Sequence, residues 1–372
     1  MFEILFPAHG EILSRKSGME KASGLQIRVY GIARPADRVT VNGITAIRCG
    51  ERFEADITLT EFRSTITVCA EGSRGKSMRE IKVIYDKNSF RRANFCMDDN
   101  IFAFAEVARD LPESIFDHFY FGHFKKLHER YGLKLTLNLF YGDLRTSFTL
   151  DRFPDRYKEE WIANSDWLKL AFHAKTEFPD RPYQNAEDEQ LLAEYDQVCN
   201  EIIRFAGKES LIAPPNIHWA MVKPSALKPL RERGVRFLGG LFLNARTRIG
   251  ENFDDTLSCD IGYFKSEEDS LFLSQKQLMY DFDHDICFGT EAIVCNLEEM
   301  PELERKLAAL AADERNEALH LLSHEQYSFP FYESYLPDHQ QRLETTVRML
   351  AQAGFKFVFF SEGFLGNSDC IS

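Results

Sequence analysis

The stretch His128–Phe140, HERYGLKLTLNLF, contains the local pattern that decides the fold class. Its first part is polar and helix-forming, Gly132 interrupts it, and an apolar run follows. A glycine at this place is typical of a helix C-cap, which needs a positive φ. The stretches RERGVRFLGG around Gly234 and AQAGFKFVFF around Gly354 repeat the same order. Repeated helix–glycine–strand units predict a parallel α/β architecture, open or closed, whose length in residues 88–372 suits a barrel with insertions.

Residues 1–87 have a different period, because apolar side chains there alternate with polar ones. Short runs of this kind, separated by turn residues, predict an antiparallel β-sandwich. The run RVTVNGITAI predicts a hairpin, since Asn42-Gly43 suits a type I′ turn. The alternating pattern resembles the small immunoglobulin-like modules that accompany carbohydrate-active enzymes. We therefore predict two domains, 1–87 and 88–372. The alternating runs are LQIRVY, FEADITL, TITVCA and EIKVIY.

The composition excludes several classes of function. Of 372 residues, 44% are hydrophobic and 28% charged, and the formal net charge is −13. Nucleic-acid binding needs a basic footprint, which this chain lacks. No apolar run is long enough to span a membrane. The run MFEILFPAHG is interrupted by Glu3 and has no basic residue before it, so we expect no secretory signal and a cytoplasmic location. No glycine-rich phosphate loop follows a strand. The oligomeric state is not indicated.

Polar residues follow many of the predicted strands of the second domain. A single polar residue after a strand is more often part of a solvated loop than of a site. The carboxyl ends of parallel strands, however, meet at one mouth in a barrel, so residues distant in sequence would lie together there. The residues in question are Asp98, Asp99, Asn100, Tyr141, His173, His218, Trp219, His324, Glu325 and Glu362.

The chemistry of these residue types favours a metal site. Aspartate and histidine are suitable ligands for Zn²⁺ or a similar divalent ion that keeps an open position for water. A second carboxylate beside a ligand carboxylate can take a proton from the metal-bound water. A histidine on the opposite wall could protonate a leaving group. This division would explain why two aspartates, Asp98 and Asp99, are adjacent.

At these residues the chain resembles the polysaccharide deacetylase superfamily of metal-dependent carbohydrate esterases. The motifs are FCMDDN, FHAKTEF and LLSH, and the resemblance extends from Asn94 to Glu362. It implies a distorted (β/α) barrel and removal of an N- or O-acetyl group from a carbohydrate. It assigns Asp98 as catalytic base, Asp99 and His173 as metal ligands, and His324 as general acid.

Two positions depart from the family pattern. Glu177 stands where the second metal histidine is usual, so the predicted ligand set is Asp99, His173 and Glu177 around a divalent ion, most simply Zn²⁺. The stretch LIAPPNIHW lacks the arginine that usually precedes the prolines, which leaves the partners of the base undefined. The remaining candidates are predicted to bind the carbohydrate, and they are Asn100, Tyr141, His218, Trp219, Glu325, Tyr327 and Glu362.

Two other functions are compatible with the same residues. One is a catalytically degenerate barrel that binds carbohydrate without turnover, because the second motif is altered and a sandwich module is present. The other is a glycoside hydrolase that pairs Asp98 with Glu325 or Glu362. Such a pair would need its carboxyl groups about 5–10 Å apart across a cleft.

Overall fold

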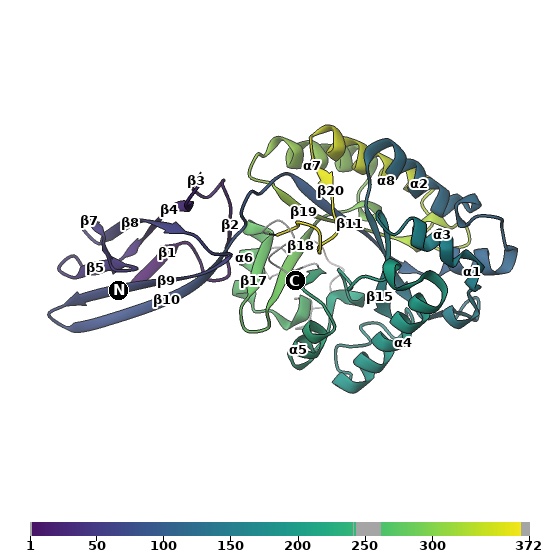
Figure 1. The fold of residues 1–372 in the computed structure, drawn as a ribbon, viewed down its shortest axis with the longest axis horizontal. Coiled ribbons are helices and arrows are strands. Elements are labelled where there is room, and N and C mark those ends of the chain that lie inside the picture. Colours follow the sequence, from purple (N-terminus) through teal and green to yellow (C-terminus); the bar gives the residue numbers. More distant parts are fainter. Residues whose placement is uncertain (1, 241, 243–261, 366–372) are drawn as a thin grey trace. The chain divides into compact units, whose positions relative to one another are not determined.

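The computed structural model describes residues 2–240, 242 and 262–365 (Figure 1). The described residues form two compact units. One contains the chain up to Ser89 together with Leu278–Cys287, and the other contains Phe90–Gln277 and Phe288–Phe364. Parts of the predicted second domain, 243–261 and 366–372, lie outside the described residues. The assignment of Leu278–Cys287 to the first unit has no counterpart in the sequence prediction.

The first unit contains two five-stranded sheets that share one apolar core. One sheet has the order β1-β4-β8-β7 with β3 on β4, and the other has the order β2-β10-β9-β5-β6. The bounds are β1 Glu3–Phe6, β2 Ile12–Leu13, β3 Met19–Lys21, β4 Gly24–Ile32, β5 Arg38–Val41, β6 Ile44–Thr45, β7 Ile47–Cys49, β8 Arg52–Leu59, β9 Arg63–Gly72 and β10 Gly75–Tyr85.

The alternating runs of the sequence are strands of this unit. In β4, Leu25, Ile27 and Val29 are buried while the residues between them are more exposed, as a strand with one face on a core requires. The predicted hairpin is confirmed, because β5 and β6 pair antiparallel across Asn42 and Gly43. Their φ angles of 47° and 81° are both positive, as a type I′ turn demands.

The second unit is built on a sheet with the strand order β15-β12-β11-β19-β18-β16, with β20 also paired to β11. The pairs β15·β12, β12·β11, β11·β19, β19·β18 and β11·β20 are all parallel. The central strand β11 has neighbours on both sides, and all nine of its residues are buried. The bounds are β11 Arg92–Asn100, β12 Leu135–Phe140, β15 Leu168–Ala174, β16 Phe237–Gly240, β18 Ile286–Val294, β19 Ala318–His324 and β20 Lys356–Phe357; the short strands are β13 Gly142–Asp143 and β14 Phe148–Thr149. The strand β17, Leu278–Asp281, belongs to the first unit.

Helices follow the parallel strands, as the sequence predicts for an α/β unit (Figure 1). Helices α2, α7 and α8 lie together, and α4 packs on β15 between α3 and α5. The glycines Gly132, Gly234 and Gly354 follow α2, α5 and α8 with φ of 70°, 94° and 84°, which confirms their predicted role. Among the described residues, no helix has both the length and the apolar character needed to cross a membrane. The bounds are α1 Phe102–Asp110, α2 Phe119–Tyr131, α3 Lys158–Ala163, α4 Asp188–Ala206, α5 Pro224–Glu232, α6 Glu267–Lys276, α7 Met300–Ala312 and α8 His339–Gln352.

Candidate metal centre

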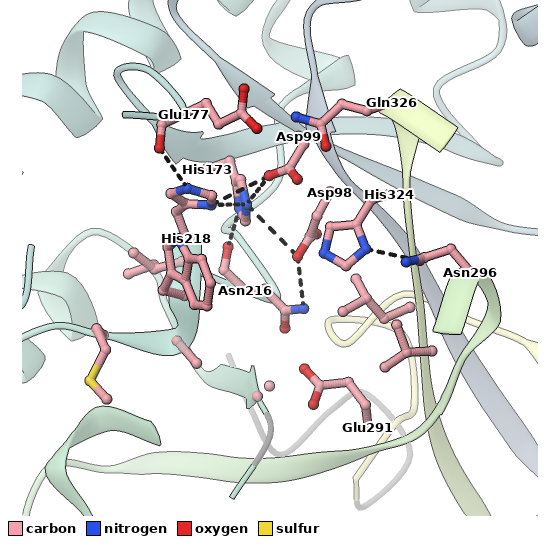
Figure 2. A pocket seen from close by; sticks show the side chains of 18 of the residues that line it. Asp98, Asp99, His173, Glu177, Asn216, His218, Glu291, Asn296, His324 and Gln326 are labelled. Atoms are coloured by element: carbon pink, nitrogen blue, oxygen red, sulfur yellow. Dashed lines mark hydrogen bonds and ion pairs between the residues drawn. The ribbon is translucent and has the colours of Figure 1, made fainter. Parts of the chain in front are cut away.

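A cavity of about 390 Å³ lies at the carboxyl ends of β11, β15 and β19 (Figure 2). Asp98 and Asp99 enter it from β11, His173 from β15 and His324 from β19. These four residues are distant in sequence, and the parallel sheet brings them together at one edge. This is the arrangement that the strand-end argument predicts for a parallel α/β fold.

A local break in β11 lets two adjacent aspartates face the same cavity. Successive side chains of a regular strand point to opposite faces, so Asp98 and Asp99 would normally diverge. The register with β12 shifts between Met97 and Asn100, and Asp99 has a φ of 62°. Aspartate tolerates this left-handed conformation better than most residues do. The irregularity therefore turns both carboxylates toward the cavity.

Asp99 lies against two imidazoles. Its Oδ1 is 3.1 Å from His173 Nε2 and 3.4 Å from His218 Nδ1. The two imidazole nitrogens are 3.1 Å apart. All three side chains are buried. Three potential ligand atoms thus converge on one point, from β11, β15 and the turn that begins at His218 (Figure 2).

The outer nitrogens of both imidazoles face backbone carbonyls. His173 Nδ1 is 3.3 Å from the carbonyl oxygen of Asn216, and His218 Nε2 is 3.2 Å from that of Glu177. A carbonyl can only accept, so each outer nitrogen carries a proton and donates it. The inner nitrogens are then the ones with a free lone pair when the rings are neutral. Carbonyl partners of this kind are usual behind metal-binding histidines.

The three inner atoms fit a divalent transition metal. Ligand atoms about 2.0–2.1 Å from a tetrahedral Zn²⁺ lie roughly 3.3 Å from one another. The separations here are 3.1, 3.1 and 3.4 Å. Two nitrogens and one carboxylate oxygen form a donor set that suits zinc and related ions. A three-residue set also leaves a fourth position for water or substrate.

The charges within the cluster reinforce this interpretation. Burial alone would raise the pKa of Asp99, but hydrogen bonds from His173 and His218 hold it well below its usual range. Burial alone would lower the pKa of His173, but the carboxylates of Asp98 and Asp99 raise it above its ordinary value. Without a cation, His173 therefore binds a proton more readily than a free imidazole does. A bound cation would replace that proton.

Asp98 has a different set of partners. Asn138 Nδ2 donates to its Oδ1 at 2.6 Å, and Asn216 Nδ2 donates to its Oδ2 at 3.3 Å. Its Oδ2 is 3.8 Å from His173 Nε2, which places the carboxylate beside the cluster. Two amides therefore orient Asp98 in a chain whose LIAPPNIHW motif has no arginine.

His324 lines the same cavity and is oriented by an amide as well. Its Nδ1 is 2.9 Å from Asn296 Oδ1, which also accepts a hydrogen bond from the Ser323 hydroxyl at 3.1 Å. Asn296 Oδ1 can only accept, so His324 Nδ1 carries a proton. This leaves His324 Nε2 as the nitrogen available to the contents of the cavity.

The carboxylate of Glu177 is not part of the cluster. It pairs with Arg145, which also lies near Asp143. Figure 2 shows the Glu177 side chain directed away from the imidazoles while its backbone oxygen faces His218. The predicted ligand set of Asp99, His173 and Glu177 therefore needs a correction: His218, predicted to bind carbohydrate, takes the third position. An available cationic partner explains why the Glu177 carboxylate turns outward.

The other predicted carbohydrate-binding residues divide into two groups. Trp219 and Tyr327 line the cavity with His218. Four others do not line it, and each has another environment. Asn100 accepts from Tyr120 and bonds backbone carbonyls, Glu325 accepts from the backbone at the start of α1, Glu362 pairs with Lys134, and Tyr141 lies next to Asp151.

Sequence reasoning missed four cavity or partner residues: Asn138, Asn216, Asn296 and Glu291. Asn138 and Glu291 are polar residues inside apolar strand sequences, which is a visible signal. Glu291 lines the cavity, and its Oε2 is buried with no hydrogen-bond partner among the described residues. Burial and the nearby charge of Asp98 raise the pKa of Glu291 to about 8. Its side chain faces the interior of the cavity in Figure 2.

Comparison with known proteins assigns no family. No model of a known protein family matches the chain, and no curated protein sequence does. Solved structures with some similarity include a 4-alpha-glucanotransferase from Thermococcus litoralis, with 12% identity, a TM-score of 0.46, and coverage of 73% of this chain and 40% of that one. Others are a polysaccharide deacetylase from Bacillus cereus (12% identity, TM-score 0.26, 60% of this chain and 82% of that one) and a chitinase from Paenibacillus (10% identity, TM-score 0.31, 95% and 42%). Similarity this low does not assign an activity.

Proposed function

We propose that the protein is a metal-dependent hydrolase that removes an acetyl group from a carbohydrate. The observation that carries the proposal is the arrangement of His173 and His218. Both rings donate their outer N–H to backbone carbonyls and turn their inner nitrogens toward Asp99. Asp98 and His324, which a hydrolase needs for proton transfer, line the same cavity.

The protein residues have separate roles in this reaction. A divalent cation held by Asp99, His173 and His218 would polarise the acyl carbonyl and acidify a water molecule. Asp98, held on both oxygens by amide donors, accepts the proton of the attacking water. His324, with both ring nitrogens protonated, gives its Nε2 proton to the departing sugar nitrogen or oxygen and is left as the neutral ring whose Nδ1–H donates to Asn296.

Aromatic side chains support a carbohydrate as the substrate. Trp219 lines the cavity with half of its surface exposed, and Tyr327 and Tyr332 line it as well. Aromatic rings present an apolar face while a tyrosine hydroxyl remains available for hydrogen bonds, and both properties suit a sugar ring. The volume of about 390 Å³ is in the range of small-molecule sites and would hold one or two sugar units.

The test measures acetate release with and without metal. The substrates are chitin oligosaccharides, acetylated xylan and p-nitrophenyl acetate. Each is incubated with protein whose metal has been removed by a chelator, and with protein loaded with Zn²⁺ or Co²⁺. We expect release only with metal, and a loss of about 10²- to 10⁴-fold in kcat for Asp98→Asn. His324→Gln should impair release from chitin oligosaccharides far more than from p-nitrophenyl acetate, whose leaving group needs no proton.

The exposed Asp110→Asn serves as the matched control, because it makes the same chemical change outside the cavity. It should behave as the wild type. Acetate release that survives metal removal, or that survives Asp98→Asn, would contradict the mechanism. Stoichiometric metal binding and carbohydrate binding without any acetate release would instead favour the non-catalytic, carbohydrate-binding alternative.

Glu291 is the specific observation that favours a second candidate function. A carboxyl group with a pKa near 8 is suited to act as a general acid, and Asp98 lines the same cavity. The pair Asp98 and Glu291 would serve a glycoside hydrolase better than the predicted pairs with Glu325 or Glu362, which do not line the cavity. In that case Glu291→Gln would abolish cleavage of a glycosidic bond and the chelator would have no effect.

A further inference from the structure

Asn216 links the metal cluster to the proposed base. Its backbone oxygen is 3.3 Å from His173 Nδ1, and its side-chain Nδ2 donates to Asp98 Oδ2 at 3.3 Å. The residue is almost fully buried, with 3% of its surface exposed. Its side chain therefore has few other conformations available. A contact that holds the Asn216 amide in place also holds Asp98 Oδ2 in place.

The other end of this amide meets His320. Asn216 Oδ1 is 3.0 Å from His320 Nε2, and His320 lies within β19 with 1% of its surface exposed. Burial lowers the pKa of His320 to about 3, so the ring is neutral and carries one N–H. His320 Nδ1 has no hydrogen-bond partner among the described residues.

These contacts determine which group donates and which accepts in each hydrogen bond from His320 through Asn216 to Asp98. An ionised Asp98 can only accept, so Asn216 must present Nδ2 to it and Oδ1 to the opposite side. Oδ1 can only accept, so His320 must carry its single proton on Nε2. The reversed amide would place an oxygen against the Asp98 carboxylate, which is repulsive. The Nε2–H tautomer of His320 thus matches the orientation of the Asn216 amide that supports Asp98 and helps to hold it.

Gly239 provides the space for this contact. A Cβ atom at position 239 would lie 2.3 Å from His320 Nε2 and 2.4 Å from Asn216 Oδ1. Both distances are too short for non-bonded atoms, so any side chain there would separate the two groups. The Gly239 N–H also donates to the carbonyl of Pro215 at 2.7 Å, directly before Asn216. Gly239 therefore holds the backbone in place and leaves a gap for the side chains.

We propose that His320 is a positioning residue that acts through Asn216 on Asp98, in a gap that only a glycine at position 239 leaves open. The hydrogen-bonded chain stands on its own geometry, and its effect on turnover rests on the proposed function. His320 does not line the cavity. Its contribution is to keep the Asp98 carboxylate at one angle to the cavity.

The kinetic test is a double-mutant cycle on the metal-loaded protein with p-nitrophenyl acetate. His320→Phe removes the donor and keeps a ring, while His320→Gln keeps a donor at a similar reach. Loss of a hydrogen-bonding partner one step behind an active group typically costs about 10–100-fold in activity. We expect that loss in kcat for His320→Phe, with KM and Zn²⁺ affinity changed less than about 3-fold, and recovery of most of it in His320→Gln.

The decisive variant combines His320→Phe with Asn216→Ala. If His320 acts through Asn216, the second change adds less than about 2-fold to the first, because coupled residues are not additive. Multiplied losses, or an equal loss in His320→Gln and His320→Phe, would overturn the proposal and leave His320 a packing residue. Gly239→Ala should reproduce the kcat loss of His320→Phe.

An activity-independent measurement separates this proposal from the proposed function. Proton–nitrogen correlation spectra of the histidine rings, with His320 assigned from His320→Gln, report which nitrogen is protonated. We expect the neutral Nε2–H form at pH 7, and a shifted Nε2–H signal in Asn216→Ala. An Nδ1–H form or a charged ring would overturn the chain of contacts. The expected spectrum without any acetate release would reject the proposed function and keep the hydrogen-bonded chain.

Discussion

The adjacent residues Asp98 and Asp99 have different kinds of partners on the two sides of the cavity. On one side, Asp99 faces the imidazoles of His173 and His218, and all three lie within 3.4 Å of one another. On the other side, Asp98 accepts hydrogen bonds from the amides of Asn138 and Asn216. Both aspartates come from the same strand and are buried to a similar degree, at 4% and 6% exposure.

The difference teaches that the partners, and not the residue type, decide what a carboxylate does here. An imidazole competes with a cation for Asp99 only while its inner nitrogen is protonated. When both rings are neutral, the Asp99 carboxylate is free to bind a cation. Amides hold Asp98 in place without neutralising its charge, so it can still accept a proton. One strand end therefore supplies both a candidate ligand and a candidate base.

The strongest test of this comparison asks whether His218, and not Glu177, completes the proposed ligand set with Asp99 and His173. We expect His218→Ala, His173→Ala and Asp99→Ala each to weaken Zn²⁺ binding at least about 100-fold, because a two-residue set no longer encloses the ion. Asp98→Asn should change the affinity less than about 10-fold. Isothermal titration calorimetry with Zn²⁺ at pH 7.5, on protein whose metal has been removed, measures the Zn²⁺ affinity of all four variants.

Glu177→Gln is the matched control, since its carboxylate pairs with Arg145 and not with the cluster. It should leave the Zn²⁺ affinity within about 3-fold of the wild type. A large loss in Glu177→Gln together with a small loss in His218→Ala would restore the ligand set that the sequence predicted. Affinity should also rise with pH through the raised pKa of His173, because the metal needs the neutral ring.

The sequence predicts the ends of β11, β15 and β19 because they are local features, whereas LIAPPNI before His218 forms no strand and β20 ends at Phe357, before Glu362. Apolar runs, C-cap glycines and the alternating strands each depend on neighbouring residues only. Asp99 and His173 follow from this, since each stands at the end of a predicted strand. His218 does not, because its place in the cluster depends on a turn after Pro214-Pro215 and on the Glu177 carbonyl. No local pattern encodes a contact between residues 41 positions apart.

Glu325 extends the comparison to a third carboxylate, whose hydrogen-bond partners in the described part of the chain are backbone N–H groups. It accepts from the N–H groups of Ile101, Phe102 and Ala103 at 2.7, 2.7 and 2.9 Å. These are among the unpaired amides at the beginning of α1, where a negative charge is favourable. Burial acts in the opposite direction and raises the pKa of Glu325 to about 8. The sequence predicted carbohydrate binding here, because a residue after a strand has the same local signature whether it caps a helix or faces a ligand.

We expect Glu325→Gln to lower the free energy of unfolding by about 2–3 kcal/mol, because an amide NH₂ would replace an acceptor that faces buried donors. Urea denaturation at pH 9, above the pKa of about 8 of Glu325, measures the loss. Glu362→Gln, which removes only an exposed ion pair with Lys134, should cost less than about 1 kcal/mol. Equal, small losses in both variants would show that the amides at the start of α1 do not depend on Glu325.

The amide partners of Asp98 show where sequence reasoning ends. Asn138 is visible as a polar residue in the apolar strand LTLNLF. Asn216 and its partner His320 are 104 residues apart, and the gap at Gly239 is a property of the packed interior. A glycine that serves close approach looks in sequence like a glycine that serves a turn. The partners of the base therefore needed the structure.

Glu291 sharpens the comparison, because its buried Oε2 has no partner among the described residues. Burial and the charge of Asp98 raise its pKa to about 8, against an ordinary value of 4.5. A raised pKa in the folded state contributes stability that is complete below pH 4.5 and is lost as the pH rises through about 8. One pKa unit corresponds to about 1.4 kcal/mol.

Glu291→Gln removes this dependence because the amide is neutral at every pH. The free energy of unfolding of the variant should therefore match the wild type near pH 5 and exceed it by about 1–2 kcal/mol at pH 8.5, a fraction of the full linkage because the side chain is only partly buried. Urea denaturation across that range measures the difference.

In an Asp98→Asn background the gain in free energy of unfolding from Glu291→Gln should shrink, since the neighbouring charge is gone. Parallel stability curves for wild type and variant would mean that Glu291 is already ionised at pH 5. Asp98 and Glu291 would then both be negative on the side of the cavity where amides hold Asp98. The Glu291 carboxylate would be the natural partner of a cationic group on a substrate.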